Sequence, residues 1–152
     1  MAHADSADVL IEQLQLQAHP EGGWYRETWR AEPDASGRAR GTAILFLLKA
    51  GESSHWHRVD ADELWLWQGG DLLELSIADD DNGPVHAVAL GSDVAAGENL
   101  QGLVPKGAWQ AARSVQGRAG YTLVSCIVVP GFDFAGFELA PPEWAPGPGN
   151  SA

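Results

Sequence analysis

Residues 51–70 read GESSHWHRVDADELWLWQGG, and this stretch decides the fold. His55 and His57 stand two residues apart, so on an extended strand both imidazoles point to the same face. Glu63 opens a second run in which Trp65 and Trp67 share its face. We therefore expect two neighbouring strands whose histidine, carboxylate and indole side chains line one cavity.

The rest of the chain, outward from this segment, is a series of short β-like runs separated by turns that contain glycine. Many short strands at such spacing are typical of an all-β sandwich or barrel. The strands expected along the chain cover residues 24–30, 42–48, 63–68, 71–78, 85–90, 101–104, 109–114, 121–129 and 132–139.

One helix is expected near the start of the chain. Asp5 or Ser6 can cap it, apolar residues then recur at helical spacing, and His19-Pro20 ends it. The chain is thus divided into a helical segment (1–18), a β domain (19–140) and a flexible tail rich in proline and glycine (141–152).

Composition limits the function. The chain has 152 residues and a formal net charge of −12, which speaks against binding to nucleic acid or to an anionic membrane surface. Its longest apolar stretch, Tyr121 to Pro130, is about half of a membrane span. A single cysteine predicts a reducing, cytoplasmic location. Seven tryptophans predict an aromatic core or an aromatic-lined pocket.

A second informative segment is LVPKGAWQAA, residues 103–112. Pro105 and Gly107 make a tight entry into a strand, on which Gln110 shares a face with Ala108 and Ala112. Glutamine is a poor ligand for transition metals but a good donor and acceptor for a polar ligand.

The two segments resemble the two cupin motifs, the first through Gly51, His55, His57, Glu63 and Gly70 and the second through Pro105 and Gly107. Four stretches together are similar to the cupin type 5 family, a group of small single-domain cupins of unassigned function. They are HPEGGWYRETWR (19–30), HRVDADELW (57–65), VPKGAWQ (104–110) and VPGFDFAGFEL (129–139).

The resemblance implies a double-stranded β-helix, or jelly-roll barrel, that commonly forms a homodimer. It further implies an internal pocket faced by His57, Glu63 and Gln110. This sequence departs from the general motif, because five residues separate His57 from Glu63 and only three separate Gly51 from His55. Gln110 stands where that motif has a third histidine.

The first functional hypothesis is a metal-free isomerase or epimerase that acts on a sugar or a similar polar metabolite. Related cupins that epimerise nucleotide sugars with a histidine base and no metal suggest it. His57 is the candidate base, Asp60, Asp62 or Glu63 would orient it, and Tyr121 or Tyr25 would donate a proton. The candidate ligand-binding residues are Trp65, Trp67, Trp109, Gln110, Tyr25 and Glu27.

Two alternatives remain open. In a metal-dependent oxygenase or isomerase, His55, His57, Glu63 and Gln110 would hold a divalent transition metal. In a non-catalytic binding or structural cupin, the same residues would only line the barrel. In either case Arg26, Arg58 and Arg113 could grip an anionic ligand or pair with surface acids.

Overall fold

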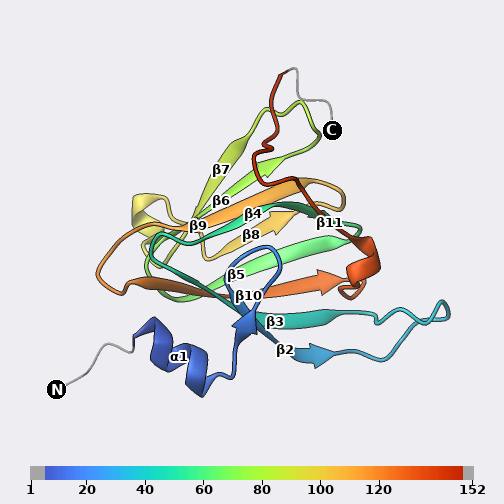
Figure 1. The fold of residues 1–152 in the computed structure, drawn as a ribbon, viewed down its shortest axis with the longest axis horizontal. Coiled ribbons are helices and arrows are strands. Elements are labelled where there is room, and N and C mark those ends of the chain that lie inside the picture. The colour runs from blue at the N-terminus through green and yellow to red at the C-terminus, as the bar shows by residue number, and fades with distance from the viewer. Residues whose placement is uncertain (1–5, 149–152) are drawn as a thin grey trace.

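The computed structural model describes residues 6–148 as two facing antiparallel β-sheets (Figure 1). One sheet has the order β1-β2-β3-β10-β5-β8: Gln17–Ala18, Trp24–Arg30, Thr42–Lys49, Tyr121–Val129, Asp62–Gly70 and Gln101–Val104. The other has the order β11-β4-β9-β6-β7: Phe137–Leu139, Ser53–Val59, Trp109–Ser114, Leu73–Ala78 and His86–Leu90. The expected all-β jelly-roll barrel with a short N-terminal helix is confirmed.

Alternation along the strands decides which side chains enter the barrel. In β10 the even-numbered residues from Thr122 to Val128 are buried, whereas the odd-numbered residues from Tyr121 to Val129 are partly or fully exposed. This period of two is what a strand with one face on a core requires. The expected strands at 24–30, 101–104, 109–114 and 121–129 have these bounds in the structure.

The helix is shorter than the sequence suggested. α1 spans Ala7–Gln13, and the Ser6 hydroxyl accepts a hydrogen bond from the Val9 amide as its N-cap. It ends well before His19-Pro20 because Gln15 adopts a left-handed conformation with φ of 57°. Gln17–Ala18 form β1, which pairs with β2, so these two residues of the expected helical segment belong to the sheet.

Two short 3-10 turns complete the chain, η1 (Val94–Ala96) and η2 (Phe134–Gly136). Because η2 lies inside the expected strand 132–139, that prediction holds only for β11. The side chain of Asp133 accepts a hydrogen bond from the Ala135 amide and so favours the turn over an extended strand.

The apolar core fills one half of the barrel. Phe46, Leu48, Trp65, Leu75 and Val124 belong to this cluster and are at most 1% exposed. The other half, toward the segment that follows β10, is open and contains the cavity described below. The barrel is therefore filled with apolar side chains at one end and hollow at the other.

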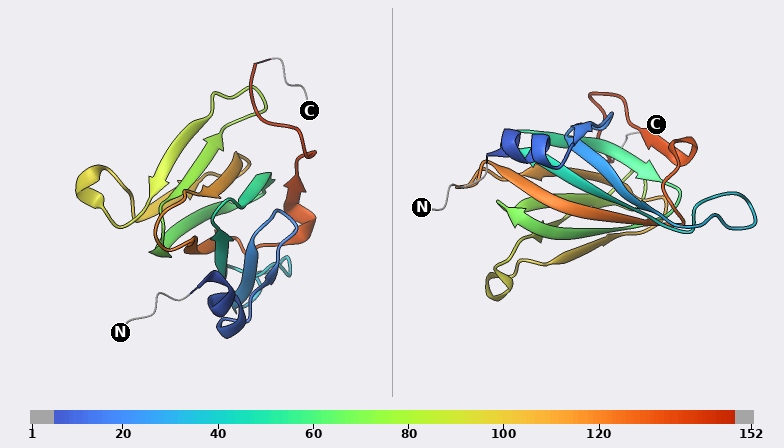
Figure 2. Two further views of the ribbon diagram at one scale, coloured as in Figure 1. Left: turned by 60° about the vertical axis from the view of Figure 1, so that its left-hand side comes forward. Right: turned by 90° about the horizontal axis from the view of Figure 1, so that it is seen from below.

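Composition predicted a flexible tail over residues 141–152. Residues 141–148 run along the five-stranded sheet (Figures 1 and 2), and residues 149–152 lie outside the described part of the chain. Trp144 stacks on Trp109 with ring centroids 4.5 Å apart, and the Gly147 amide donates to the carbonyl of Asp81. No helix among residues 6–148 is long and apolar enough to cross a membrane.

A β-bulge in β4 changes which side chains face inward. Ser54 pairs with Ala112 and His57 with Gln110, so three steps along β4 match two along β9. Ser54 and His57 are both buried at 1% exposure, whereas the His55 ring bonds the carbonyl of Pro141 outside the barrel. The expectation that His55 and His57 share a face is wrong because one extra residue reverses the alternation.

The turn between β1 and β2 folds across the start of β4. The His55 amide donates to the carbonyl of Glu21 at 2.8 Å, and the His19 amide donates to that of Gly23 at 3.0 Å. Gly22 has φ of +107°, and a Cβ there would overlap the carbonyl oxygen of Ser53. Only glycine permits this close approach, which places Glu21 over the start of β4, beside Ser54 and His57.

We expect Gly22→Ala to lower the free energy of unfolding by about 1–3 kcal/mol more than Gly51→Ala does. Gly51 also has positive φ, but a Cβ there meets only open space, so that variant carries the backbone strain without the overlap. Urea unfolding of both variants measures the difference. Equal losses of stability would contradict the close approach.

Candidate functional site

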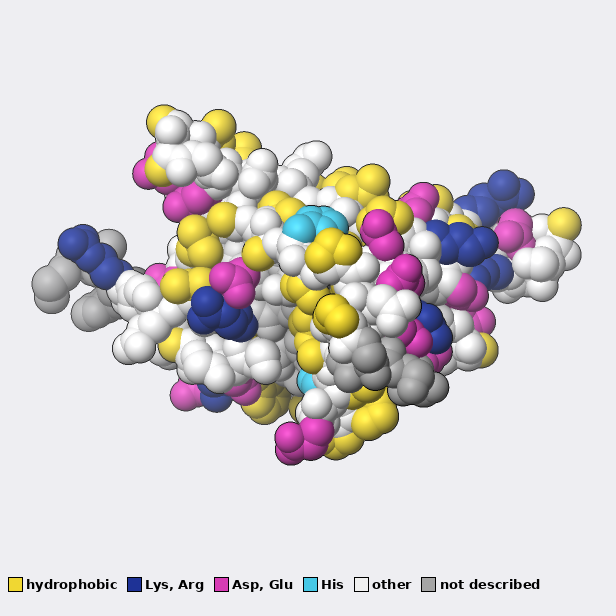
Figure 3. All heavy atoms as spheres, turned by 90° about the horizontal axis from the view of Figure 1, so that it is seen from above, with side chains coloured by type: hydrophobic (Ala, Val, Ile, Leu, Met, Phe, Trp, Pro, Cys, Tyr) yellow, Lys and Arg dark blue, Asp and Glu magenta, His cyan; other side chains and the backbone are white. Residues whose placement is uncertain are grey.

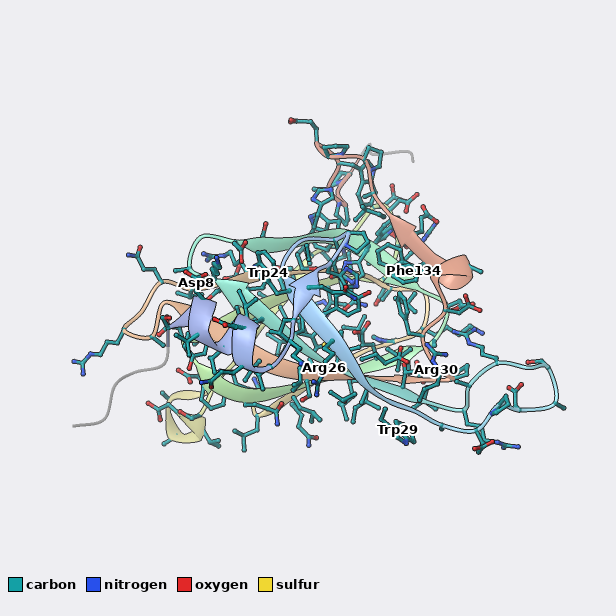
Figure 4. The ribbon with its side chains drawn as sticks, turned by 60° about the horizontal axis from the view of Figure 1, so that its bottom comes forward. Asp8, Trp24, Arg26, Trp29, Arg30 and Phe134 are labelled. Atoms are coloured by element: carbon teal, nitrogen blue, oxygen red, sulfur yellow. The ribbon has the colours of Figure 1, made fainter. Side chains whose placement is uncertain are left out.

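A cavity of about 510 Å³ occupies the open half of the barrel. Its floor carries the titratable side chains His19, Glu21, His57 and Glu63, and its wall carries Tyr25, Phe132 and Phe134 among others. Figure 4 shows Arg30 on β2 and Phe134 beyond the end of β10, both cavity-lining residues, whereas Trp29 points away from them. The volume is that of a site for a small metabolite.

His57 is held in a defined tautomer. Its Nδ1 lies 2.7 Å from the carbonyl oxygen of His55, and because a carbonyl only accepts, Nδ1 is the protonated nitrogen. Nε2 therefore carries a lone pair and lies 3.2 Å from Oε2 of Glu21. Burial lowers the pKa of His57, so the neutral imidazole is favoured.

Glu21 enters the same floor from the β1–β2 turn. Its Oε2 also receives a hydrogen bond from the Ser54 hydroxyl, and its side chain is 9% exposed. Burial raises the pKa of Glu21 to about 8. At neutral pH the carboxyl group is thus largely protonated, so its contact with His57 is a hydrogen bond between two neutral groups.

Glu63 faces the cavity from β5, on the opposite sheet. Its Oε1 accepts a hydrogen bond of 2.9 Å from Nε2 of Gln110, whose Oε1 accepts one of 2.9 Å from Nε1 of Trp65. These two bonds orient the carboxyl group. Burial raises the pKa of Glu63 to about 7, although the neighbouring His57 and Gln110 favour the ionised form.

His19 closes the floor beside Glu21. Its Nδ1 accepts a hydrogen bond of 3.1 Å from the Glu21 amide, and its ring packs against Tyr25 at 4.5 Å and Phe134 at 6.2 Å. Burial lowers the pKa of His19 to about 4, with a smaller contribution from His57. His19 is therefore a neutral, aromatic part of the floor at physiological pH.

The rim of the cavity is charged. Both carboxylate oxygens of Glu27 accept hydrogen bonds of 2.8 Å from the Arg30 guanidinium, which also donates to the carbonyl of Phe132 at 3.3 Å. Asp133 lies on the same rim. The pKa of Arg30 is raised above its ordinary value, chiefly by the bonds to Glu27.

The sequence of this chain matches a known protein family. The family described as "Cupin superfamily (DUF985)" matches residues 8–140. The chain belongs to this cupin family. Two solved structures support the assignment. A protein from Shewanella oneidensis is 42% identical, with a TM-score of 0.83 over 90% of this chain and 85% of that one.

A hypothetical protein from Leishmania major is 38% identical to this cupin, with a TM-score of 0.81 over 90% of this chain and 88% of that one. An oxalate decarboxylase variant from Bacillus subtilis is 14% identical, with a TM-score of 0.61 over 82% of this chain and 30% of that one, which shows a common fold only. None of the curated proteins matches this chain.

Four of the candidate site residues predicted from the sequence lie together in the cavity. His57, Glu63, Tyr25 and Glu27 all line it. Gln110 is 1% exposed and lies behind Glu63, where its amide links Glu63 to Trp65. It therefore acts on the site through Glu63.

The candidate tryptophans do not line the cavity. Trp65 belongs to the packed half of the barrel, with Trp67 against it. Trp109 alternates with Gln110 and so faces outward, where Arg58 and Trp144 cover it. Tyr121 pairs with Lys49 beside Gly70, at the packed end. The aromatic wall consists instead of Tyr25, Phe132 and Phe134.

The residues proposed as metal ligands do not form a set. The bulge directs His55 to the outside, and the amide of Gln110 is used by Trp65 and Glu63. Within residues 6–148, no group of three or more His, Cys, Asp or Glu side chains is arranged to hold a metal ion. The proposed metal ligands are therefore directed apart or already bonded to other side chains.

Sequence reasoning did not assign His19 and Glu21 to the site. The sequence indicates His19 only as the residue before the proline that ends the expected helix, and Glu21 only as part of the segment 19–30 that resembles the cupin type 5 family. The feature of the sequence that could have indicated their role is Gly22-Gly23. These two adjacent glycines have positive φ and bring the turn that carries Glu21 into contact with β4.

The raised pKa of Glu21 predicts a pH dependence of stability. Because the folded state binds this proton more tightly than the unfolded state, its contribution is complete below about pH 4.5 and is lost as pH rises toward about 8. Glu63 acts in the same direction, up to about pH 7. Thermal melts from pH 5 to 9 should show a smaller loss of Tm for Glu21→Gln than for the wild type. Parallel curves would contradict the raised pKa.

Proposed function

We propose that this cupin is an isomerase or epimerase that moves a proton on a small polar metabolite without a metal. The observation that carries the proposal is His57, whose Nδ1 proton is donated to the His55 carbonyl and whose Nε2 lone pair meets Glu21 at the cavity floor. A base fixed in one tautomer and buried in a water-poor site is suited to general base catalysis.

The two sheets supply groups from opposite sides. The His57–Glu21 pair belongs to β4 and the turn that crosses it, and Glu63 belongs to β5 of the other sheet. The His57–Glu21 pair takes the proton from a carbon next to a carbonyl, the C–H electron pair forms a C=C bond, and the carbonyl π electrons move to the oxygen to give an enolate. Protonated Glu63, with a pKa of about 7, then gives its proton to the opposite face of that carbon as the enolate electrons form the new C–H bond and the carbonyl is restored. Proton exchange with solvent returns the pair and Glu63 to their starting states.

Gln110 and Ser54 are positioning residues in this scheme. Gln110 donates to Glu63, and Ser54 donates to Glu21, so each holds one carboxyl group in place. Such support keeps catalytic groups in reactive orientation.

The proposal predicts exchange of a substrate C–H with solvent deuterium in a panel of small carbonyl compounds, among them free sugars and amino sugars, followed by NMR. We expect His57→Gln to slow the exchange by about 100-fold or more, because an amide cannot accept the proton. His86→Gln, on the exposed side of β7, should leave it unchanged. A thermal melt of His57→Gln that matches the melt of the wild type would exclude unfolding as the cause of the slower exchange.

His55→Gln separates this scheme from a metal-dependent one. His55 lies outside the cavity, so acid–base catalysis predicts full exchange activity in this variant. Loss of exchange in His55→Gln would contradict the proposal, and so would unchanged exchange in His57→Gln.

We also infer that the cupin forms a homodimer through the outer face of the six-stranded sheet. The strand register places Trp29, Ala43, Ile127, Leu64 and Leu103 in one row across five strands. Trp29 and Leu103, at its ends, are 51% and 57% exposed. A second copy of the chain, related by a two-fold axis, presents the same apolar row and can cover it.

Leu103→Asp should weaken self-association roughly 100-fold, because a carboxylate would be buried without a partner. Val94→Asp, at an equally exposed apolar residue in η1, is the control and should not change it. Sedimentation velocity over micromolar concentrations measures both. A wild-type monomer, or equal effects of the two variants, would contradict this dimer.

A further inference from the structure

The charge of the cavity bears on the ligand that it accepts. Among the described residues that line it, Arg30 is the one cationic side chain, whereas four carry carboxyl groups: Glu21, Glu27, Glu63 and Asp133. A phosphate or carboxylate ligand needs a donor with positive charge, usually arginine or lysine. The number of positively charged donors in the cavity therefore determines whether it favours an anionic or a cationic ligand.

Arg30 is already committed to other partners. Its Nε and Nη2 atoms donate to the two oxygens of Glu27, each at 2.8 Å, and Nη2 also donates to the carbonyl of Phe132. A bidentate pair of this kind satisfies the donor edge that an anionic group would use. With Asp133 beside it, the rim carries more negative than positive charge.

The histidines add no positive charge to the floor. Burial lowers the pKa of His19 to about 4 and also lowers that of His57. Both imidazoles are neutral at physiological pH, so an anion gains nothing from them.

The arginines that the sequence offered for an anionic ligand lie elsewhere. Arg26 donates to Gln15, Arg58 donates to Glu138 above the ring of Trp109, and Arg113 donates to Glu74. None of the three lines the cavity. Acidic and basic side chains are also interspersed on the face shown in Figure 3, without a continuous basic patch there.

The wall of the cavity suits a cation. Tyr25, Phe132 and Phe134 line it, and the rings of Phe132 and Phe134 meet edge to face with centroids 4.8 Å apart. The faces of aromatic rings attract cations through their quadrupole. Carboxylates at the rim and aromatic rings along the wall are a combination that recognises organic cations.

We propose that the cavity binds a small organic cation, an amine- or amidine-bearing metabolite, in preference to a phosphate- or carboxylate-bearing one. This inference rests on the proposed function, since it takes the same cavity as the substrate site. It narrows the substrate class to polar metabolites with a basic nitrogen and excludes nucleotide-linked sugars.

The test compares three probes of similar shape: benzamidine, benzyl alcohol and benzoate, which are cationic, neutral and anionic. Binding to the full chain is measured by isothermal titration at low and high salt. We expect affinity to fall in that order, and the preference for benzamidine over benzoate to weaken at high salt because the rim carboxylates are exposed. Tighter binding of benzoate, or no binding of benzamidine at millimolar concentration, would overturn the proposal.

The double variant Glu27→Gln/Asp133→Asn should reduce the preference for benzamidine about tenfold, as expected for two exposed charges. Both amides retain an acceptor oxygen, for Arg30 and for the Ala135 amide respectively. Glu32→Gln/Glu143→Gln removes the same total charge from exposed positions outside the cavity and should leave the preference intact. An equal effect of the two double variants would overturn the proposal.

The two experiments distinguish a failure of the proposed chemistry from a failure of the proposed ligand class. His57→Gln is expected to slow deuterium exchange by about 100-fold or more and to keep the preference for benzamidine, because the rim charges are unchanged. Exchange that depends on His57 together with a preference for benzoate would overturn the ligand class alone. A preference for benzamidine with no dependence of exchange on His57 would overturn the proposed chemistry alone.

Discussion

The buried hydrogen-bond chain from Trp65 through Gln110 to Glu63 is the interaction on which the site depends. It crosses from β5 to β9, and therefore from one sheet to the other, at the level where the packed half of the barrel meets the open half. A polar group buried at that boundary must find a partner, since an unsatisfied donor or acceptor costs about 1–3 kcal/mol. The chain satisfies both ends of Gln110 and leaves the Glu63 carboxyl group facing the cavity.

Gln110 explains why this cupin departs from a metal-binding pattern. A glutamine donates and accepts through one amide, so it can hold an indole on one side and a carboxyl group on the other. Here both functions are used. The position thus serves to orient Glu63, and the bulge in β4 completes the change by turning His55 outward and Ser54 inward toward Glu21.

The electrostatic character of the cavity follows from burial. Two carboxyl groups and two imidazoles share a floor that water reaches poorly, so their pKa values shift toward the neutral forms: upward for Glu21 and Glu63, downward for His19 and His57. Groups that would be ions in water become proton donors and acceptors near neutral pH. The rim, where Glu27, Arg30 and Asp133 are exposed, keeps its charges and selects what enters.

Alternation along a strand is a local property, so the sequence was enough to predict the all-β class and the bounds of four strands. The resemblance to the cupin type 5 family implied the pocket faced by His57 and Glu63, and Tyr25 and Glu27 were further candidates that the structure places in the same cavity. The same alternation separates Gln110 from Trp109, yet the sequence still offered Trp109 as a ligand-binding residue, and in the structure Arg58 and Trp144 cover it on the outer side of the sheet. The remaining features depend on contacts between strands distant in the chain, which a local pattern does not contain. They are the extra residue in β4, the depth to which the core fills the barrel around Trp65, and the crossing of Gly22 over Ser53.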